Sequence, residues 1–232
     1  MKTEQYAAIT SPQGNDLLSV VDVNDASMAP AGTTKRMTLA QLAAFIAPPQ
    51  GPRMFPLAGG GEVAFHPALA NQNAIALATG TMLLAYGYAQ VSETIGHVSI
   101  PTGGTAATGA TYAAYGLFTV DGSGNLTRVA ATASNTSLWT TNFQAYNGTN
   151  VSQALTATYA KVAGQLYAAG LLYVGAGTAP TIVGASGFAG DGGSSLAAGL
   201  SGKVTGLATL PSSVTAGSVA STPFVPACVL LP

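Results

Sequence analysis

The sequence predicts an all-β protein, an antiparallel β-sandwich or jelly-roll head that follows a short N-terminal segment containing one α-helix. Three observations predict this class. From about residue 70 onward, runs of apolar and small polar residues recur at short intervals and are separated by Gly-rich turns. No amphipathic helical pattern lies between these runs. Charged residues make up only 6% of the chain. Short strands at such spacing are typical of sandwiches and jelly rolls.

The first 47 residues are the predicted N-terminal anchoring segment. LLSVVDV (17–23) is a short β-type run, and the Asn and Asp residues after it indicate a turn. Thr38, with Gln41 three residues later, then has the pattern of a capping box that begins a helix.

The predicted helix has one apolar face, formed by Leu39, Leu42, Ala43 and Ile46 at i, i+3, i+4 and i+7. It ends before Pro48, because proline bars the preceding residue from helical geometry. About two turns are too few to be stable alone in water. We therefore expect this helix to dock on a partner.

Residues 48–69 follow as a Pro- and Gly-rich linker or arm, and residues 70–232 as the head domain. Prolines stiffen the first part of the linker, and three consecutive glycines loosen its end. An ordered arm lying on another subunit is an equal alternative for this segment.

Strands of the head are predicted from period-2 alternation and from the turn residues between runs. Met82, Leu84, Tyr86 and Tyr88 share one face of the first run. The second and third runs form a hairpin around DGSGN, and the fourth and fifth form another around Gly164. The predicted strands are 81–91, 110–120, 126–133, 151–162, 165–177, 212–220 and 224–231.

Composition excludes several classes of function. The net charge is −1, which argues against nucleic acid as a partner, since nucleic acid selects basic patches. The uncharged run 162–190 is broken by glycines and a proline, so no membrane insertion is expected. Cys228 is the single cysteine and there are two histidines, a set that suggests neither a metal site nor a cofactor.

Charge is concentrated at the N-terminus. Residues 1–62 hold five of the eight acidic residues and four of the seven basic ones. A body so poor in charge is unusual for a free monomer, because interspersed charge keeps monomers apart. It is typical of a chain whose surface is covered by copies of itself or by a larger assembly.

Catalysis is not expected. Glu93, Asp121 and Asp191 could supply a pair of carboxylates for glycoside hydrolysis. However, Asp121 and Asp191 each precede glycine, and a turn explains them without chemistry.

Three aromatic residues in a polar stretch are candidates for binding glycans: Trp139, Phe143 and Tyr146. Exposed aromatic rings among Asn and Thr suit stacking on sugars. Large aromatic side chains are usually buried, so Trp139 is better explained as a cap on the end of the core.

Two stretches resemble a known group of proteins. DLLSVVDVNDASMAPAGTTKRMTLAQLAAFI (16–46) resembles a segment that recurs in bacteriophage virion proteins, especially those of phages of actinobacteria, where it precedes diverse C-terminal modules of tail and head fibres and minor tail proteins. The stretches 115–139, 159–182 and 210–231 are similar to one such module, which implies a jelly-roll-like head that is commonly trimeric. Unlike long fibres, this chain has no collagen-like or coiled-coil shaft.

The resemblance implies a homotrimeric spike or fibre on the virion surface, assembled in the host cytoplasm, with the head available for host attachment. Its partners would be other virion proteins, such as major capsid or tail proteins, and host-surface glycans. A capsid decoration protein without receptor binding is the alternative, and a glycan-degrading tail enzyme is a weaker one. The predicted attachment residues are Lys35, Arg36, Leu39, Leu42, Phe45 and Ile46.

Overall fold

The computed structural model describes residues 17–22, 33–38, 52–64, 71–148, 150–186 and 200–232. The chain divides into two compact units, Met1–Pro49 and Gln50–Pro232, and each is described here by itself. In both units the named strands pair in antiparallel sheets, so the predicted all-β class is confirmed.

The first unit contains a β-hairpin. Strand β1 (Leu17–Asp22) pairs with β2 (Thr33–Thr38) along its whole length, from Leu17 opposite Thr38 to Asp22 opposite Thr33. The β-type run predicted at 17–23 is thus confirmed. The sequence analysis did not predict β2, although its β-branched threonines favour a strand.

The second unit, which we call the body, contains in its described part a short 3₁₀ turn, η2 (Ala216–Ser218), besides its strands. Its strands in chain order are β3 (Phe55–Pro56), β4 (Glu62–Val63), β5 (Asn71–Ala76), β6 (Thr81–Tyr88), β7 (Glu93–Ser99), β8 (Ala110–Val120), β9 (Leu126–Ala131), β10 (Ser152–Lys161), β11 (Leu166–Gly175), β12 (Thr181–Ser186), β13 (Ser201–Val204), β14 (Ser213–Val214), β15 (Phe224–Pro226) and β16 (Val229–Leu231).

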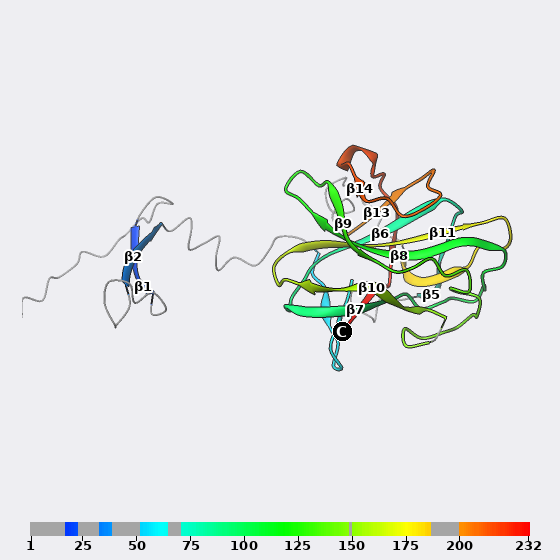
Figure 1. Cartoon of the computed structure of the whole chain (residues 1–232), viewed down its shortest axis with the longest axis horizontal. Helices are drawn as coiled ribbons and strands as arrows, with labels where there is room; N and C mark the ends of the chain where they lie inside the picture. The colour runs from blue at the N-terminus through cyan, green and yellow to red at the C-terminus, as the bar shows by residue number, and fades with distance from the viewer. Residues whose placement is uncertain (1–16, 23–32, 39–51, 65–70, 149, 187–199) are drawn as a thin grey trace, which may run out of the picture. The chain divides into compact units, whose positions relative to one another are not determined.

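These strands form three sheets. The six-stranded sheet has the order β13-β6-β11-β8-β9-β14, with β8 and β11 crossing the body side by side (Figure 1). The five-stranded sheet has the order β10-β7-β16-β4-β3, and the three-stranded sheet the order β15-β12-β5. Among the described residues, no helix is long and apolar enough to span a membrane.

The six-stranded sheet is apolar on both faces. Along β6, Leu83 and Ala85 enter the larger hydrophobic core, whereas Met82, Leu84 and Tyr86 enter a second core. This alternation follows from the period of two in a strand. Met82, Leu84 and Tyr86 therefore share one face of the strand, as predicted.

Each core also takes side chains from other parts of the body. The larger core also takes side chains from β7, β12, β15 and β16, so it lies between the six-stranded sheet and the other two sheets. The second core also takes Val204 and Val214 from the edge strands β13 and β14 of the six-stranded sheet, and Leu210 from the segment between these two strands. Burying both faces explains why β6 and β11 are nearly continuous runs of apolar and small residues.

Strand pairing agrees with the sequence prediction at one hairpin and differs at the other. The hairpin of β8 and β9 around DGSGN is confirmed. The pairing predicted around Gly164 is wrong: β10 pairs with β7, whereas β11 pairs with β6 and β8. The turn at Gly164 therefore carries the chain from one sheet to another. The physical reason is burial, because β11 is buried almost throughout and needs neighbours at both edges, while much of β10 is exposed.

The run predicted as one strand at 224–231 is divided in the same way. Strand β15 pairs with β12 in the three-stranded sheet, and β16 pairs with β4 and β7 in the five-stranded sheet. Residues Ala227 and Cys228 connect the two strands and are buried.

Residues 52–64, within the segment predicted as a linker or arm, contribute to the body. Met54 is buried in the larger core, and its backbone N–H donates to the carbonyl of Tyr88 at 3.0 Å. Strands β3 and β4 extend the five-stranded sheet, with Glu62 opposite Leu230. The Pro- and Gly-rich composition of this segment therefore reflects two short strands joined by a tight turn.

Candidate functional site

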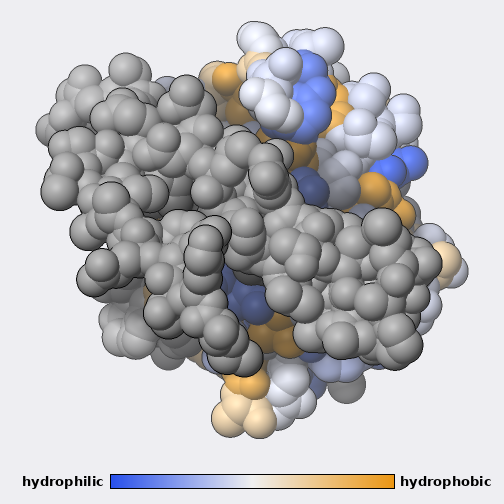
Figure 2. Space-filling view, turned by 90° about the vertical axis from the view of Figure 1, so that its left-hand side faces the viewer, coloured by the Kyte–Doolittle hydropathy of each residue, from blue (hydrophilic) through white to orange (hydrophobic). Residues whose placement is uncertain are grey.

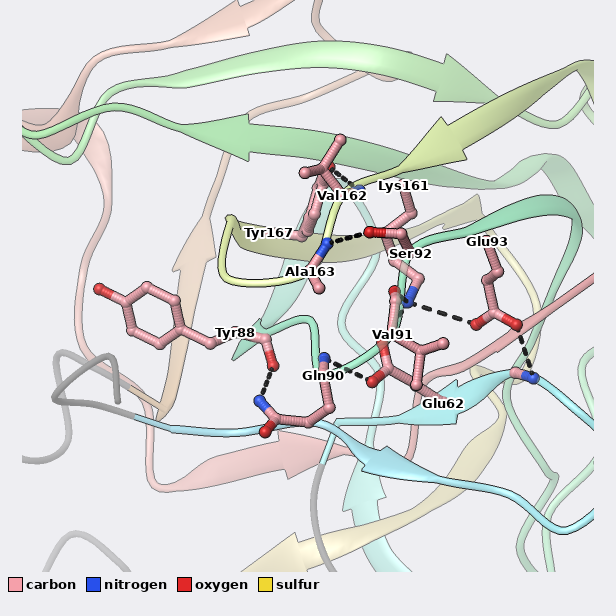
Figure 3. Close-up of polar contacts among 11 residues, drawn as sticks. Glu62, Tyr88, Gln90, Val91, Ser92, Glu93, Lys161, Val162, Ala163 and Tyr167 are labelled. Atoms are coloured by element: carbon pink, nitrogen blue, oxygen red, sulfur yellow. Dashed lines mark hydrogen bonds and ion pairs between the residues drawn. The ribbon is translucent and has the colours of Figure 1, made fainter. Parts of the chain in front are cut away.

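Three charged side chains from three strands meet inside the body (Figure 3). Lys161 is the last residue of β10, Glu62 the first of β4 and Glu93 the first of β7. The side chains of Lys161 and Glu62 have no exposed surface, whereas that of Glu93 is 17% exposed. We call these three residues the buried charge cluster.

Within the buried charge cluster, Lys161 is the centre. Its Nζ contacts Oε2 of Glu62 and lies 3.3 Å from Oε1 of Glu93. It also donates a hydrogen bond of 2.7 Å to the backbone carbonyl of Val91. An ammonium group has three donors, and two of them make hydrogen bonds, to Oε2 of Glu62 and to the carbonyl of Val91.

Backbone amides hold the two carboxylates. The N–H of Gln90 donates to Oε1 of Glu62 at 2.6 Å, and the N–H of Gly61 donates to Oε2 of Glu93 at 3.2 Å. Oε1 of Glu93 is buried and accepts no hydrogen bond, so its ion pair with Lys161 is its one polar contact. If all three groups are ionised, the buried charge cluster carries one net negative charge.

The cluster lies where two connections pass between sheets. The segment between β6 and β7 and the segment between β10 and β11 each join the six-stranded to the five-stranded sheet. Hydrogen bonds join these two segments. The N–H of Gly164 donates to the carbonyl of Ala89 at 2.8 Å, and the N–H of Ala163 donates to the Ser92 hydroxyl at 2.9 Å. In some proteins a buried ion pair helps to specify one conformation, and the position of this one between two connections is compatible with that role.

A second candidate is the aromatic loop, residues 137–150. Phe143 is 59% exposed and Tyr146 is 43% exposed, which is unusual for side chains of this size. Their neighbours Asn142, Ala145 and Asn147 are also exposed and carry no charge. This surface therefore combines two aromatic rings with neutral hydrogen-bonding groups.

The aromatic loop is held firmly against the segment that follows β7. The N–H of Phe143 donates to the carbonyl of Gly103 at 2.9 Å, and the N–H of Gln144 donates to the Thr102 hydroxyl at 2.8 Å. The hydroxyl of Ser99 donates to the carbonyl of Tyr146. Phe143 has a φ of 51°, a left-handed conformation that costs energy for a non-glycine residue and often marks functional loops.

Trp139 differs from the other two aromatic residues because it is fully buried. Its ring packs edge-to-face on Tyr115, with centroids 5.4 Å apart and an interplanar angle of 82°. The hydroxyl of Tyr115 in turn donates to the carbonyl of Val151 at 2.8 Å. Trp139 thus supports the loop from beneath, as expected for a cap on the core, and its side chain is not on the surface.

The acids considered for catalysis lie in separate places. Glu93 belongs to the buried charge cluster. Asp121 is exposed in the turn between β8 and β9, where its carboxylate accepts hydrogen bonds from the backbone of Ser123 and from the backbone and side chain of Asn125. Asp191 lies outside the described residues. Within the described part of the chain, no group of three or more His, Cys, Asp or Glu residues is placed to hold a metal ion.

The predicted attachment residues are described only in part. Lys35 lies opposite Val20 and Arg36 opposite Ser19 in the β1–β2 hairpin. Thr38, predicted to cap that helix, is the last residue of β2. The rest of the predicted helix lies outside the described residues, including Leu39, Leu42, Phe45 and Ile46.

Sequence reasoning missed the buried charge cluster as a unit. Glu62 and Lys161 are 99 residues apart, and the segment that contains Glu62 was predicted to be a linker. One signal was available: Lys161 is a charged residue in an otherwise uncharged strand pair, where charge is rarely tolerated without a partner.

Comparison with known protein families and curated proteins identifies no relative of this chain. No protein-family model matches the chain, and no curated protein matches its sequence. Functional inference therefore rests on the residues themselves and on their arrangement.

Proposed function

We propose that this chain is a structural protein of a bacteriophage virion, a short homotrimeric spike or fibre on the tail or head. Residues 1–47 would attach it to the particle, and the body would be exposed at the virion surface for host attachment. The resemblance of residues 16–46 to a recurrent segment of phage virion proteins supports this proposal. So does the division of the chain into a small N-terminal unit and a larger β-sheet body.

The observation that carries the proposal is the scarcity of charge on the body. Among its described residues, the exposed charged ones are Arg53 and Asp121. Glu62 and Lys161 are buried, and Arg128 uses its guanidinium to donate to the carbonyl of Leu210 at 2.6 Å. Much of the coloured surface in Figure 2 is accordingly pale, with hydropathy near the middle of the scale. A surface depleted of charge is typical of one that contacts other subunits.

We also propose that the body is a sandwich of the jelly-roll type. In support, its larger core lies between the six-stranded sheet and the other two sheets, and several connections cross between them. Such heads commonly assemble as trimers in the proteins that the sequence resembles.

Host attachment would use the aromatic loop. Phe143 and Tyr146 offer two exposed rings on a backbone fixed by hydrogen bonds, so little conformational entropy is lost when a sugar stacks on them. Their uncharged neighbours favour a neutral glycan over an acidic one. Trp139 would act by supporting the loop rather than by touching the sugar.

Electron microscopy of whole particles tests the proposal. Labelled antibodies against the body should decorate virions at defined positions, and virions carrying the Leu42→Asp variant should lack the protein. That variant places an unpaired charge at the predicted apolar contact. Ala40→Asp, on the other face of the predicted helix, is the matched control and should still be incorporated. Absence of the wild-type protein from purified particles would contradict the proposal.

A capsid decoration protein is the second candidate, favoured by the same charge-poor surface. The number of copies per particle separates the two, because decoration needs many copies and a receptor spike few. A glycan-degrading enzyme is the third candidate. Single replacement of Glu93, Asp121 and Asp191 by the corresponding amides would abolish cleavage of host-wall glycans if it were correct.

A further inference from the structure

The contact between Lys161 and Glu62 unites an amine and a carboxyl group in a site closed to solvent. Both side chains are fully buried, and Nζ of Lys161 touches Oε2 of Glu62. An amine and a carboxyl group held in contact can condense to form an amide. We propose that Lys161 and Glu62 become joined by a covalent bond between Nζ and Cδ, and that Glu93 transfers the protons.

Each reacting group has a fixed partner. The carbonyl of Val91 accepts a hydrogen bond from Nζ at 2.7 Å and so orients the nitrogen. The N–H of Gln90 donates to Oε1 of Glu62 at 2.6 Å, where it stabilises the negative charge that develops when nitrogen attacks the carboxyl carbon. Holding two reactants in this way corresponds to an effective concentration of about 10⁵–10⁸ M in well-oriented cases.

Glu93 is placed to act as the base and then the acid. Its Oε1 lies 3.3 Å from Nζ and accepts no hydrogen bond, so it is free to receive a proton. Its other oxygen is fixed by the N–H of Gly61 at 3.2 Å. An ammonium nitrogen has no lone pair and cannot attack until it loses a proton, and Glu93 is placed to accept that proton.

The atoms and charges balance. One of the three protons on Nζ stays on the amide nitrogen. Glu93 carries the other two, in turn, to Oε2 of Glu62, which leaves as water while Oε1 becomes the amide oxygen. The C–O bond to Oε2 breaks, the C–N bond forms, and Glu93 returns to its carboxylate form. The net charge of the buried charge cluster is the same before and after.

Burial favours the product. An ion pair in a closed interior carries the desolvation cost of two charges, and conversion to an amide removes both. Glu93 is the member of the cluster that reaches solvent, with 17% of its side chain exposed, so the released water has a way out beside it.

The bond would tie distant parts of one sheet. Strand β10 lies at one edge of the five-stranded sheet, and β7 and β16 separate it from β4. The two residues are 99 positions apart, so the bond would close a long loop. Closing a long loop restricts the unfolded chain and resists unfolding.

Intact mass spectrometry of the denatured full-length chain tests the bond, together with tryptic mapping. We expect the mass to be lower than that of the sequence by one water molecule. Trypsin should not cleave after Lys161, and the peptide 54–128 should be found attached to 129–203. Lys161→Arg, which keeps the charge but cannot condense, should show the full mass of its own sequence.

The Glu93→Gln variant tests the proton transfer, and it should be unlinked although it keeps both reacting groups. A wild-type chain with its full mass and normal cleavage after Lys161 would leave an ion pair only and overturn the proposal. A bond from Lys161 to Glu93, or a fully linked Glu93→Gln chain, would overturn the assigned roles.

Discussion

Replacement of Gly61 by alanine tests whether the turn before β4 is part of the body. Gly61 has a φ of 86°, and a Cβ added there would lie 2.2 Å from the carbonyl oxygen of Leu230 in β16. Gly59, two residues earlier, has no atom within 4 Å of such a Cβ. Gly59→Ala is therefore a matched control within the same turn.

The expected cost of Gly61→Ala has two parts. A left-handed conformation costs an alanine about 1–2 kcal/mol, and the steric overlap with the backbone of β16 costs about 1–3 kcal/mol more. The sum is about 2–5 kcal/mol, and for a body of this size each 1 kcal/mol lowers Tm by about 2–4 °C. Gly59→Ala should change the free energy of unfolding by less than about 0.5 kcal/mol.

Thermal unfolding of both variants, followed by circular dichroism, measures this difference. If Gly61→Ala and Gly59→Ala melt at the same temperature as the wild type, residues 52–64 are not packed in the body. The assignment of β4 to the five-stranded sheet would then be wrong.

Three further predictions concern single side chains. Tyr115→Phe should lower the free energy of unfolding by about 1–3 kcal/mol, because the buried carbonyl of Val151 loses its partner; an unchanged denaturation midpoint would contradict the described packing. The pKa of Asp121 is lowered from 3.8 because the side chain and backbone of Asn125 donate to its carboxylate. The ionised carboxylate therefore stabilises the folded chain above the pKa of the unfolded state, and this stabilisation is lost as the pH falls through the lower pKa of the folded state. Asp121→Asn should therefore have a lower Tm than the wild type at pH 7, and the difference should shrink below about pH 4; a difference that is constant with pH would refute this. Burial raises the pKa of the Cys228 thiol, so alkylation by iodoacetamide should require denaturant, and rapid labelling of the native chain would contradict its burial.

The sequence predicted those parts of the fold that depend on local pattern. The alternation of Met82, Leu84 and Tyr86 identified a strand, and DGSGN identified the β8–β9 hairpin, because turn chemistry and period act within a few residues. Asp121 was correctly explained as a turn residue for the same reason.

Pairing between distant strands could not be predicted in this way. Gly164 allows a turn, but whether that turn joins two paired strands or two sheets depends on which neighbours bury β11. The buried charge cluster is a stronger case, since Glu62 and Lys161 have no relation in sequence and meet only through the order of the five-stranded sheet.

For the aromatic loop, the sequence identified the aromatic residues but did not show which of their side chains are exposed. Trp139, Phe143 and Tyr146 lie in similar polar surroundings in the sequence. Their burial differs because the backbone of Trp139 is held between Ala107 and Asn150, which directs this residue into the core. Such contacts come from segments far along the chain.

The measurement that bears most directly on the proposed structural role is the mass of the full chain in solution, determined by sedimentation equilibrium at micromolar concentration. Each chain has a mass of 22.9 kDa. The homotrimer proposed above predicts a particle of three chains. A species of one chain across the concentration range would contradict the account.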